Sequence, residues 1–213
     1  MKLKDKTITR AIVERFTKKF IDNLDQDVII AGAGPAGLTL AYHLAKNGIK
    51  VSIFERKLSI GGGMWGGGML FNEIVVGEEG REILDSFGVN TEKYEEGYYT
   101  ADSIETVSTI CSNAMKAGAK IFNCMSVEDV MVNKNGVCGV VVNWSTVEMA
   151  GLHVDPLCVK SKIVVEATGH PLELLKILEN KVDGKLFTKT GRIMGERSMN
   201  AEVGERTVVE NTK

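Results

Sequence analysis

Residues 28–37 of the chain read Val28-Ile29-Ile30-Ala31-Gly32-Ala33-Gly34-Pro35-Ala36-Gly37. The apolar start of this stretch has the length and β-branching of a buried parallel strand, and a glycine loop follows it directly. Residues 38–47 then have helical spacing and end at Gly48, and residues 50–55 form a second apolar run that ends in Glu55. Strand, glycine turn, helix and strand within about 30 residues predict the first βαβ unit of a Rossmann-like α/β fold.

The glycine loop is typical of a site for the pyrophosphate of a dinucleotide. Gly32 permits the tight turn, Gly34 lets the backbone approach the phosphates, and Gly37 allows the helix to pack closely on the strand. The N-terminus of that helix can then neutralise the anion. Glu55 is placed to accept hydrogen bonds from the adenosine ribose, which favours a ligand without a 2′-phosphate. The pattern does not distinguish FAD from NAD as the ligand. The alternative to a ligand site is that the loop is only a turn between a strand and a helix.

Length and charge narrow the class of protein. The chain has 213 residues, with 26 Lys and Arg against 28 Asp and Glu, and we expect one dinucleotide-binding domain over residues 1–213. Because this balance gives no basic field, we expect neither nucleic acid nor a membrane as a partner. The charged start, Met1 to Lys6, has no apolar stretch behind it and no run reaches membrane-spanning length, which predicts a cytoplasmic protein.

The rest of the chain has patterns of further helices and strands. An amphipathic helix over Ile8–Leu24 precedes the first strand and is expected to pack on the domain or on a neighbouring subunit. Asn135-Gly136 is a strong hairpin signal inside an inserted β-rich region. Residues beyond Lys181 are expected to form a loop or insertion. The other expected elements are helices over 78–87, 103–117 and 171–178, and strands over 120–123, 126–132, 137–144 and 161–167.

A second group of polar residues lies further along the chain. Pro156 biases Asp155 toward an extended conformation, and in an extended segment His153 and Asp155 point to one side. His170 follows the expected strand 161–167 at its carboxyl end, the edge of a parallel sheet where ligands bind. Imidazole together with carboxylate suits a divalent transition metal such as iron. The alternative is that these histidines are only hydrogen-bonded near the end of a sheet.

Several other residues have structural explanations. The cysteines show no CxxC spacing, so we expect reduced, mostly buried thiols rather than a zinc site. Trp144 is expected in the core, and His43 is expected on the surface of the first βαβ helix or satisfied within the core. Trp65 lies in a glycine-dense segment and fits a cofactor lid as well as an anchor for its own loop. The cysteines are Cys111, Cys124, Cys138 and Cys158.

Two segments contain highly specific motifs, GGGMWGGGM over Gly61–Met69 and EMAGLHVDP over Glu148–Pro156. Gly32–Leu38, Ala167–His170 and Glu196–Lys213 extend the pattern over nearly the whole chain. In these segments the chain resembles the thiamine thiazole synthase family, specifically its archaeal branch.

The resemblance implies a flavoprotein-like fold, of the FAD/NAD-binding type, that uses NAD as a substrate. In this family NAD, glycine and a sulfur source form an adenylated thiazole carboxylate, and nicotinamide is released. The positions of Asp155 and His170 are those that bind Fe(2+), and the assembly is a homo-octamer. His153, Val154 and Asp155 match a segment that contacts the nucleotide across a subunit boundary. The other positions that the resemblance places at the adenosine and phosphates are Ala33, Ala36, Glu55, Arg56, Gly63 and Val127.

His153 is the most informative of these positions. In the fungal and plant branch this position is a cysteine that gives up its own sulfur, and the enzyme acts only once. A histidine cannot donate sulfur, so the resemblance implies a sulfide-dependent enzyme with multiple turnovers. We expect His153 to orient the intermediate or to act as an acid or base, a role for which imidazole is suited.

One departure from the family pattern concerns the end of the chain. Family members continue past the motif Val208–Lys213 into a further strand and a glycine-rich segment that contacts the nucleotide and glycine. We therefore expect that the family's C-terminal segment is absent here. Two alternatives to thiazole synthesis remain: an FAD-dependent oxidoreductase of the same fold, and a catalytically incomplete NAD-binding protein.

Overall fold

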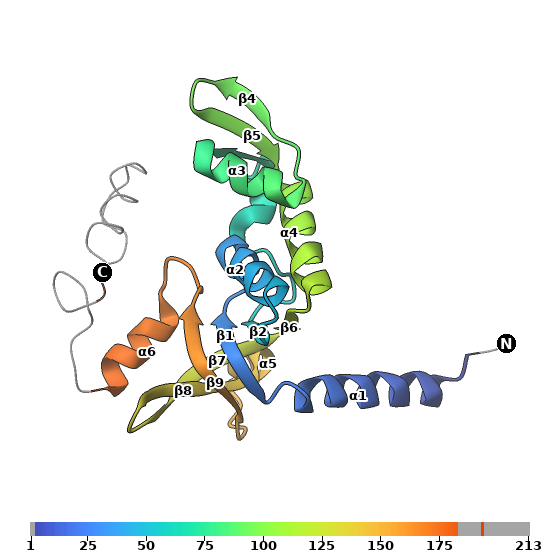
Figure 1. Ribbon diagram of the computed structural model, residues 1–213. Coiled ribbons are helices and arrows are strands. Elements are labelled where there is room, and N and C mark those ends of the chain that lie inside the picture. The colour runs from blue at the N-terminus through green and yellow to red at the C-terminus, as the bar shows by residue number, and fades with distance from the viewer. Residues whose placement is uncertain (1–2, 183–192, 194–213) are drawn as a thin grey trace.

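The computed structural model describes residues 3–182 and residue 193, and its centre is a six-stranded sheet in the order β6-β2-β1-β9-β8-β7 (Figure 1). β1 pairs in parallel with β2 and β9, and β2 pairs in parallel with β6. β8 pairs antiparallel with both β7 and β9. The expected Rossmann-like α/β fold is confirmed. The strands are β1 (Asp25–Ala31), β2 (Val51–Glu55), β6 (Lys120–Asn123), β7 (Met125–Asn133), β8 (Gly136–Trp144) and β9 (Leu157–Glu166).

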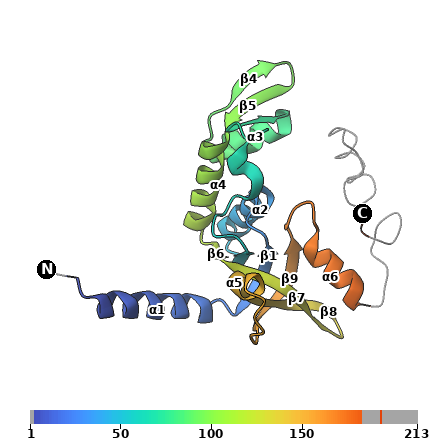
Figure 2. The ribbon, with the colours of Figure 1, turned by 180° about the vertical axis from the view of Figure 1, so that it is seen from behind.

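Each face of the parallel strands has its own core, because successive side chains of a strand point to opposite faces. On one face, Val28 and Ile30 of β1 pack with residues of α2 (Pro35–Lys46) and α4 (Ser103–Ala117), which lie side by side (Figures 1 and 2). On the other face, Ile29 packs with residues of β7, β8 and β9. Coverage on both faces explains why β1 and β2 appear in the sequence as unbroken apolar runs.

A second sheet has three strands in the order β3-β5-β4 and lies with α3 at the end of the molecule opposite the β7–β8 hairpin (Figures 1 and 2). Its strands have only four or five residues and give little sequence signal, and all four residues of β4 are exposed. The helix α3 matches the expected helix 78–87. The bounds are β3 (Glu73–Val76), α3 (Glu78–Phe87), β4 (Glu92–Glu95) and β5 (Tyr98–Asp102).

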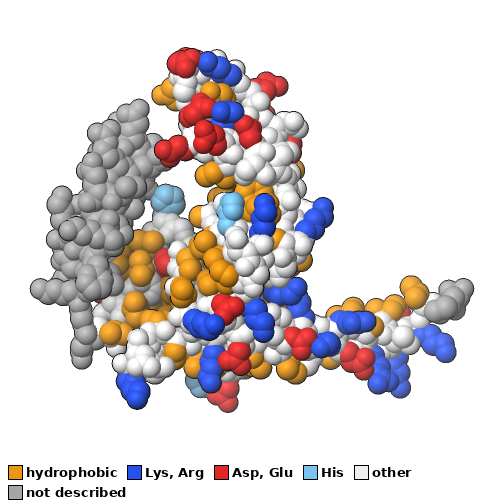
Figure 3. Space-filling view, viewed as in Figure 1, with side chains coloured by type: hydrophobic (Ala, Val, Ile, Leu, Met, Phe, Trp, Pro, Cys, Tyr) orange, Lys and Arg blue, Asp and Glu red, His pale blue; other side chains and the backbone are white. Residues whose placement is uncertain are grey.

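The N-terminal helix α1 (Asp5–Ile21) projects from the body of the protein (Figures 1 and 2). None of its residues is buried, and exposed apolar side chains that include Ile8 and Ile12 follow one side of it (Figure 3). Its C-terminal part does pack on the sheet: the ring centroid of Phe20 lies 5.5 Å from that of Phe122. The expected amphipathic helix is therefore confirmed, and it contacts the rest of the chain at one end.

Two expectations about the burial of side chains were wrong. Trp144 is 39% exposed rather than in the core, because it is the last residue of β8, where its ring lies 5.6 Å from that of Phe16 on α1. The cysteines are free thiols as expected, but none is fully buried: three are half-buried and Cys158 is exposed. Cys111, Cys138 and Cys158 lie on α4, β8 and β9, which have exposed as well as buried residues, and Cys124 lies between β6 and β7. Partial burial raises the pKa of the Cys111 thiol. His43 lies exposed on α2, one of its two expected settings.

Three short helical segments supply residues near the carboxyl ends of the parallel strands: η1 (Gly62–Gly66), α5 (Ser145–Met149) and α6 (Glu173–Lys181). Within the described residues, no helix combines the length and apolar character needed to cross a membrane. The loop or insertion expected beyond Lys181 falls outside the described residues from residue 183 on, residue 193 apart.

Candidate functional site

A cavity of about 1240 Å³ opens at the carboxyl ends of the parallel strands. It is lined by the glycine loop, the segment after β2, the start of β7, and the segment that leads from β9 into α6. Ligands of open α/β sheets bind at this edge. Because small-molecule sites typically have volumes of about 300–1,000 Å³, the cavity has room for an extended ligand.

The glycine loop has one open position between two crowded ones. Gly32 has a φ of +104°, and a Cβ added there would lie 2.3 Å from the carbonyl oxygen of Ala167. A Cβ on Gly37 would lie 2.3 Å from the carbonyl oxygen of Gly32. A Cβ on Gly34 would meet no atom within 4 Å. Gly32 and Gly37 are thus required by the fold, whereas Gly34 leaves open space at the N-terminus of α2, where the first amides have no partner within the helix.

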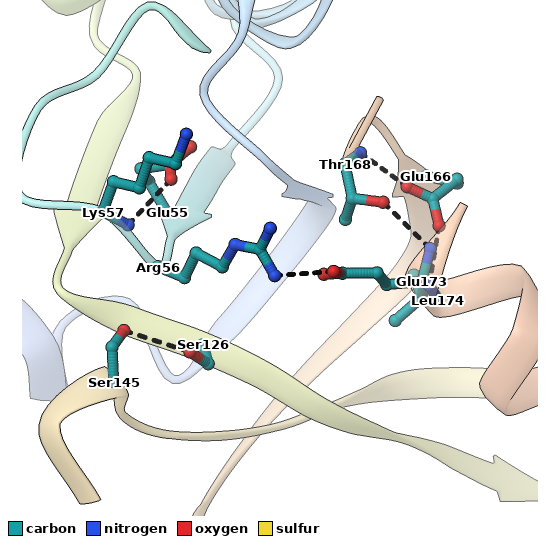
Figure 4. Close-up of polar contacts among 9 residues, drawn as sticks. All are labelled: Glu55, Arg56, Lys57, Ser126, Ser145, Glu166, Thr168, Glu173 and Leu174. Atoms are coloured by element: carbon teal, nitrogen blue, oxygen red, sulfur yellow. Dashed lines mark hydrogen bonds and ion pairs between the residues drawn. The ribbon is translucent and has the colours of Figure 1, made fainter. Parts of the chain in front are cut away.

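Glu55 fixes the glycine loop from the end of β2. The residue is 7% exposed, and its Oε2 accepts a hydrogen bond from the backbone N–H of Ala33 at 2.8 Å. Its Oε1 accepts a second hydrogen bond, also 2.8 Å long, from the N–H of Lys57 (Figure 4). Glu55 also lines the cavity. Beyond the expected ribose contact, Glu55 therefore holds the loop in place.

The glycine-dense segment lies beside this loop. The N–H of Gly61 donates to the carbonyl oxygen of Ala33 at 2.7 Å, and Gly63 lines the cavity. Trp65 does not line the cavity, and its indole N–H donates to the carbonyl oxygen of Ile60 in the same segment. Of the two interpretations of Trp65, this geometry favours the anchor of its own loop.

Opposite walls of the cavity are joined by an ion pair. Arg56 follows β2, and its Nη1 lies 2.6 Å from Oε1 of Glu173, the first residue of α6 (Figure 4). The N-terminus of α6 is itself held by Glu166, the last residue of β9, whose Oε2 accepts from the N–H of Leu174 at 2.7 Å. The Glu166 Oε1 accepts from the N–H of Thr168 at 2.5 Å.

Sequence reasoning missed Glu166 and Glu173. A usable signal exists for the first, because Glu166 ends the strand β9 as Glu55 ends β2. No local pattern marks Glu173 as a partner of Arg56, since 117 residues separate the two in the chain. Val127, expected at the adenosine, does line the cavity at the start of β7.

The residues expected to bind a metal lie at opposite ends of one strand. His170 lines the cavity just after β9, whereas His153 and Asp155 are exposed on the loop before β9 and do not line it. At about 3.3 Å per residue, the ten residues of β9 span roughly 30 Å. Among the described residues, no three His, Cys, Asp or Glu side chains are grouped so that they could hold a metal ion. A site that uses both Asp155 and His170 therefore requires two copies of the chain.

Comparison with known proteins places this geometry in a family. The model of the Thi4 family matches residues 9–213. The chain belongs to the Thi4 family. Among its relatives, the thiamine thiazole synthase of Methanothermobacter thermautotrophicus is 59% identical over 213 residues, which are 100% of this chain and 83% of the relative.

Solved structures agree with membership of the Thi4 family. The THI4 protein of Thermovibrio ammonificans matches with a TM-score of 0.92 and 49% sequence identity, over 100% of this chain and 82% of that chain. The myxobacterial halogenase CndH, described as FAD-dependent, matches with a TM-score of 0.53 and 16% identity, over 78% of this chain and 41% of its own. The second match concerns the fold alone, and it relates this Thi4 family member to the flavoprotein-like α/β proteins.

Proposed function

We propose that this chain is a sulfide-dependent thiazole synthase of thiamine biosynthesis. It converts NAD, glycine and sulfide into an adenylated thiazole carboxylate and releases nicotinamide. The observation that supports this reaction class best is the 59% identity, over the whole chain, to a protein named thiamine thiazole synthase. We further propose a homo-octamer, as the family resemblance implies, and a cytoplasmic location, as the charged N-terminal sequence suggests.

The cavity supplies the chemistry that a bound NAD needs. The N-terminus of α2 and the open space at Gly34 suit the pyrophosphate, because helix amides and the helix dipole favour an anion. The Glu55 carboxylate has lone pairs left for the ribose hydroxyls after accepting two backbone N–H groups. Gly63 and Val127 line the same space. NAD would thus be held as the substrate that is consumed, with its adenosine end fixed by the first βαβ unit.

Iron binding is proposed at a site shared by two copies. Asp155 of one copy and His170 of another form an oxygen and nitrogen donor set of the kind that Fe(II) accepts. Within one chain β9 keeps these residues apart, so the proposed site exists only in an oligomer. Asp155 and His170 would hold the iron, which would supply a centre with affinity for sulfide.

The presence of a histidine at position 153 supports the proposal that the sulfur comes from outside the protein. A histidine has no sulfur to give, and none of the four cysteines lines the cavity formed by the described residues. We assign to His153 the orientation of the intermediate or a proton transfer. Replacing His153 with Ala is expected to slow turnover about 10²–10⁴-fold, the usual contribution of acid–base groups, while NAD still binds. Steady-state kinetics with an NAD titration check this, and undiminished turnover would reject the assignment.

One experiment separates this proposal from its alternatives. The purified protein is incubated without oxygen with NAD, glycine, Fe(II) and sulfide, and the products are analysed by mass spectrometry. An adenylated thiazole formed in several equivalents per chain supports the proposal. A bound flavin with a visible absorption spectrum indicates an oxidoreductase instead, and NAD binding without any product indicates a catalytically incomplete NAD-binding protein.

A further inference from the structure

The ion pair between Arg56 and Glu173 crosses the cavity in which NAD is proposed to bind. Arg56 extends from the β2 side and Glu173 from the first turn of α6, with 2.6 Å between Nη1 and Oε1 (Figure 4). The Arg56 side chain is 50% exposed and that of Glu173 is 38% exposed. Pairs with such exposure contribute little to stability, so the fold alone gives little reason for this contact.

The backbone at Glu173 is held by hydrogen bonds at the start of α6. Its backbone N–H donates to the Thr168 Oγ1 at 3.0 Å, and the following N–H groups of Leu174 and Leu175 donate to the Glu166 carboxylate at 2.7 and 3.2 Å. Arg56, in contrast, has a long side chain with many rotamers. Three hydrogen bonds thus anchor the backbone from which the Glu173 carboxylate extends.

A guanidinium held in this way keeps donors for a ligand. Arg56 has five N–H donors, and the contact at Nη1 uses only part of them. Two further acidic residues, Glu128 and Glu148, line the same cavity. We propose that Glu173 is a positioning residue that holds Arg56 across the cavity so that its remaining N–H groups meet the dinucleotide. This inference rests on the proposed binding of NAD.

A double-mutant cycle on NAD affinity tests the proposal. Isothermal titration calorimetry gives the Kd for NAD of the wild-type protein, Glu173→Gln, Arg56→Met and the double variant. We expect Glu173→Gln to raise Kd about three- to tenfold, toward the lower end of the coupling found between neighbouring residues. In the Arg56→Met background the same change is expected to have no further effect. Glu173→Gln should raise the KM for NAD and leave kcat unchanged, the signature of lost uniform binding.

Asp129→Asn is the matched control. Asp129 pairs with Lys181 at the other end of α6, at 2.5 Å and with side chains 37% and 39% exposed, and neither residue lines the cavity. Loss of this ion pair is expected to leave the Kd for NAD unchanged, and thermal unfolding checks that each variant is folded. Glu173→Asp, which keeps the charge, is expected to have an intermediate Kd and serves if Glu173→Gln does not fold.

Each other outcome has a separate meaning. An unchanged or lower Kd in Glu173→Gln overturns the positioning role, because the pair would then be neutral toward NAD or compete with it. An equal loss in the wild-type and Arg56→Met backgrounds overturns it as well, since Glu173 would act without Arg56. Wild-type protein that binds no NAD rejects the proposed function and this inference with it.

Discussion

The glycine loop and the His153–Asp155 loop occupy opposite ends of the same sheet and differ in how they become a site. In the first, β1, the loop, α2 and β2 are consecutive in the chain, and residue 33 contacts residue 55 directly. In the second, Asp155 is close in sequence to His170 but separated from it by the whole of β9. A short distance along the chain thus brings the glycine loop and Glu55 into contact in one case. In the other case it leaves the two residues proposed to bind iron at opposite ends of β9, so the proposed site would need a second copy of the chain.

The largest expected effect concerns the glycine loop, the first region of this comparison. Gly32→Ala should place a methyl group against the carbonyl of Ala167 in a backbone conformation with φ of +104°. We expect a loss of about 2–4 kcal/mol in the free energy of unfolding, from strain and overpacking together, and no measurable NAD binding. Urea denaturation and calorimetry check this. A variant as stable as the wild type would show that the fold does not require glycine at position 32.

The second prediction tests the other region of the comparison, the proposed site formed by Asp155 and His170. Asp155→Ala and His170→Ala should each lose thiazole formation by about a hundredfold or more, because even the groups that orient metal ligands contribute about 10–100-fold. If the site is shared, co-expressing the two variants should restore a substantial part of the activity, since some sites in mixed oligomers contain both native residues.

The control for that experiment is a mixture of differently tagged chains with the same substitution, which should stay inactive. Mixed oligomers that form and remain inactive would contradict a site shared between copies. Such a result would require Asp155 and His170 to act within one chain, against their positions at the two ends of β9.

The smallest of these effects sharpens the role of the glycine loop. Gly34→Ala adds a methyl group where no atom lies within 4 Å and where the backbone, with φ of −73° and ψ of 178°, accepts an ordinary residue. Stability should therefore change by less than about 1 kcal/mol. NAD should bind about tenfold more weakly, or about 1.4 kcal/mol, because the methyl occupies the approach of the phosphates. Unchanged affinity would place the pyrophosphate elsewhere in the cavity.

Much of the fold was predictable because its signals are local. The turn at Gly32, the strand alternation and helices such as 103–117 follow from chain geometry and appear at the expected positions. The small sheet was missed because its strands have only four or five residues, too few to establish a period, and β4 is fully exposed with three charged side chains. Trp144 was misplaced because an aromatic residue at a strand end can rest on the surface against a neighbouring helix.

The sequence by itself determined the βαβ unit, its glycine loop and the acid at the end of β2, because each depends on backbone conformation and side-chain period within one short segment. Only the tertiary structure decided that Glu55 holds the loop, that Glu173 meets Arg56 and that β9 separates Asp155 from His170. The physical reason is that hydrogen bonds, ion pairs and shared sites depend on distances through space, and those distances are set by packing of segments that are far apart in the chain.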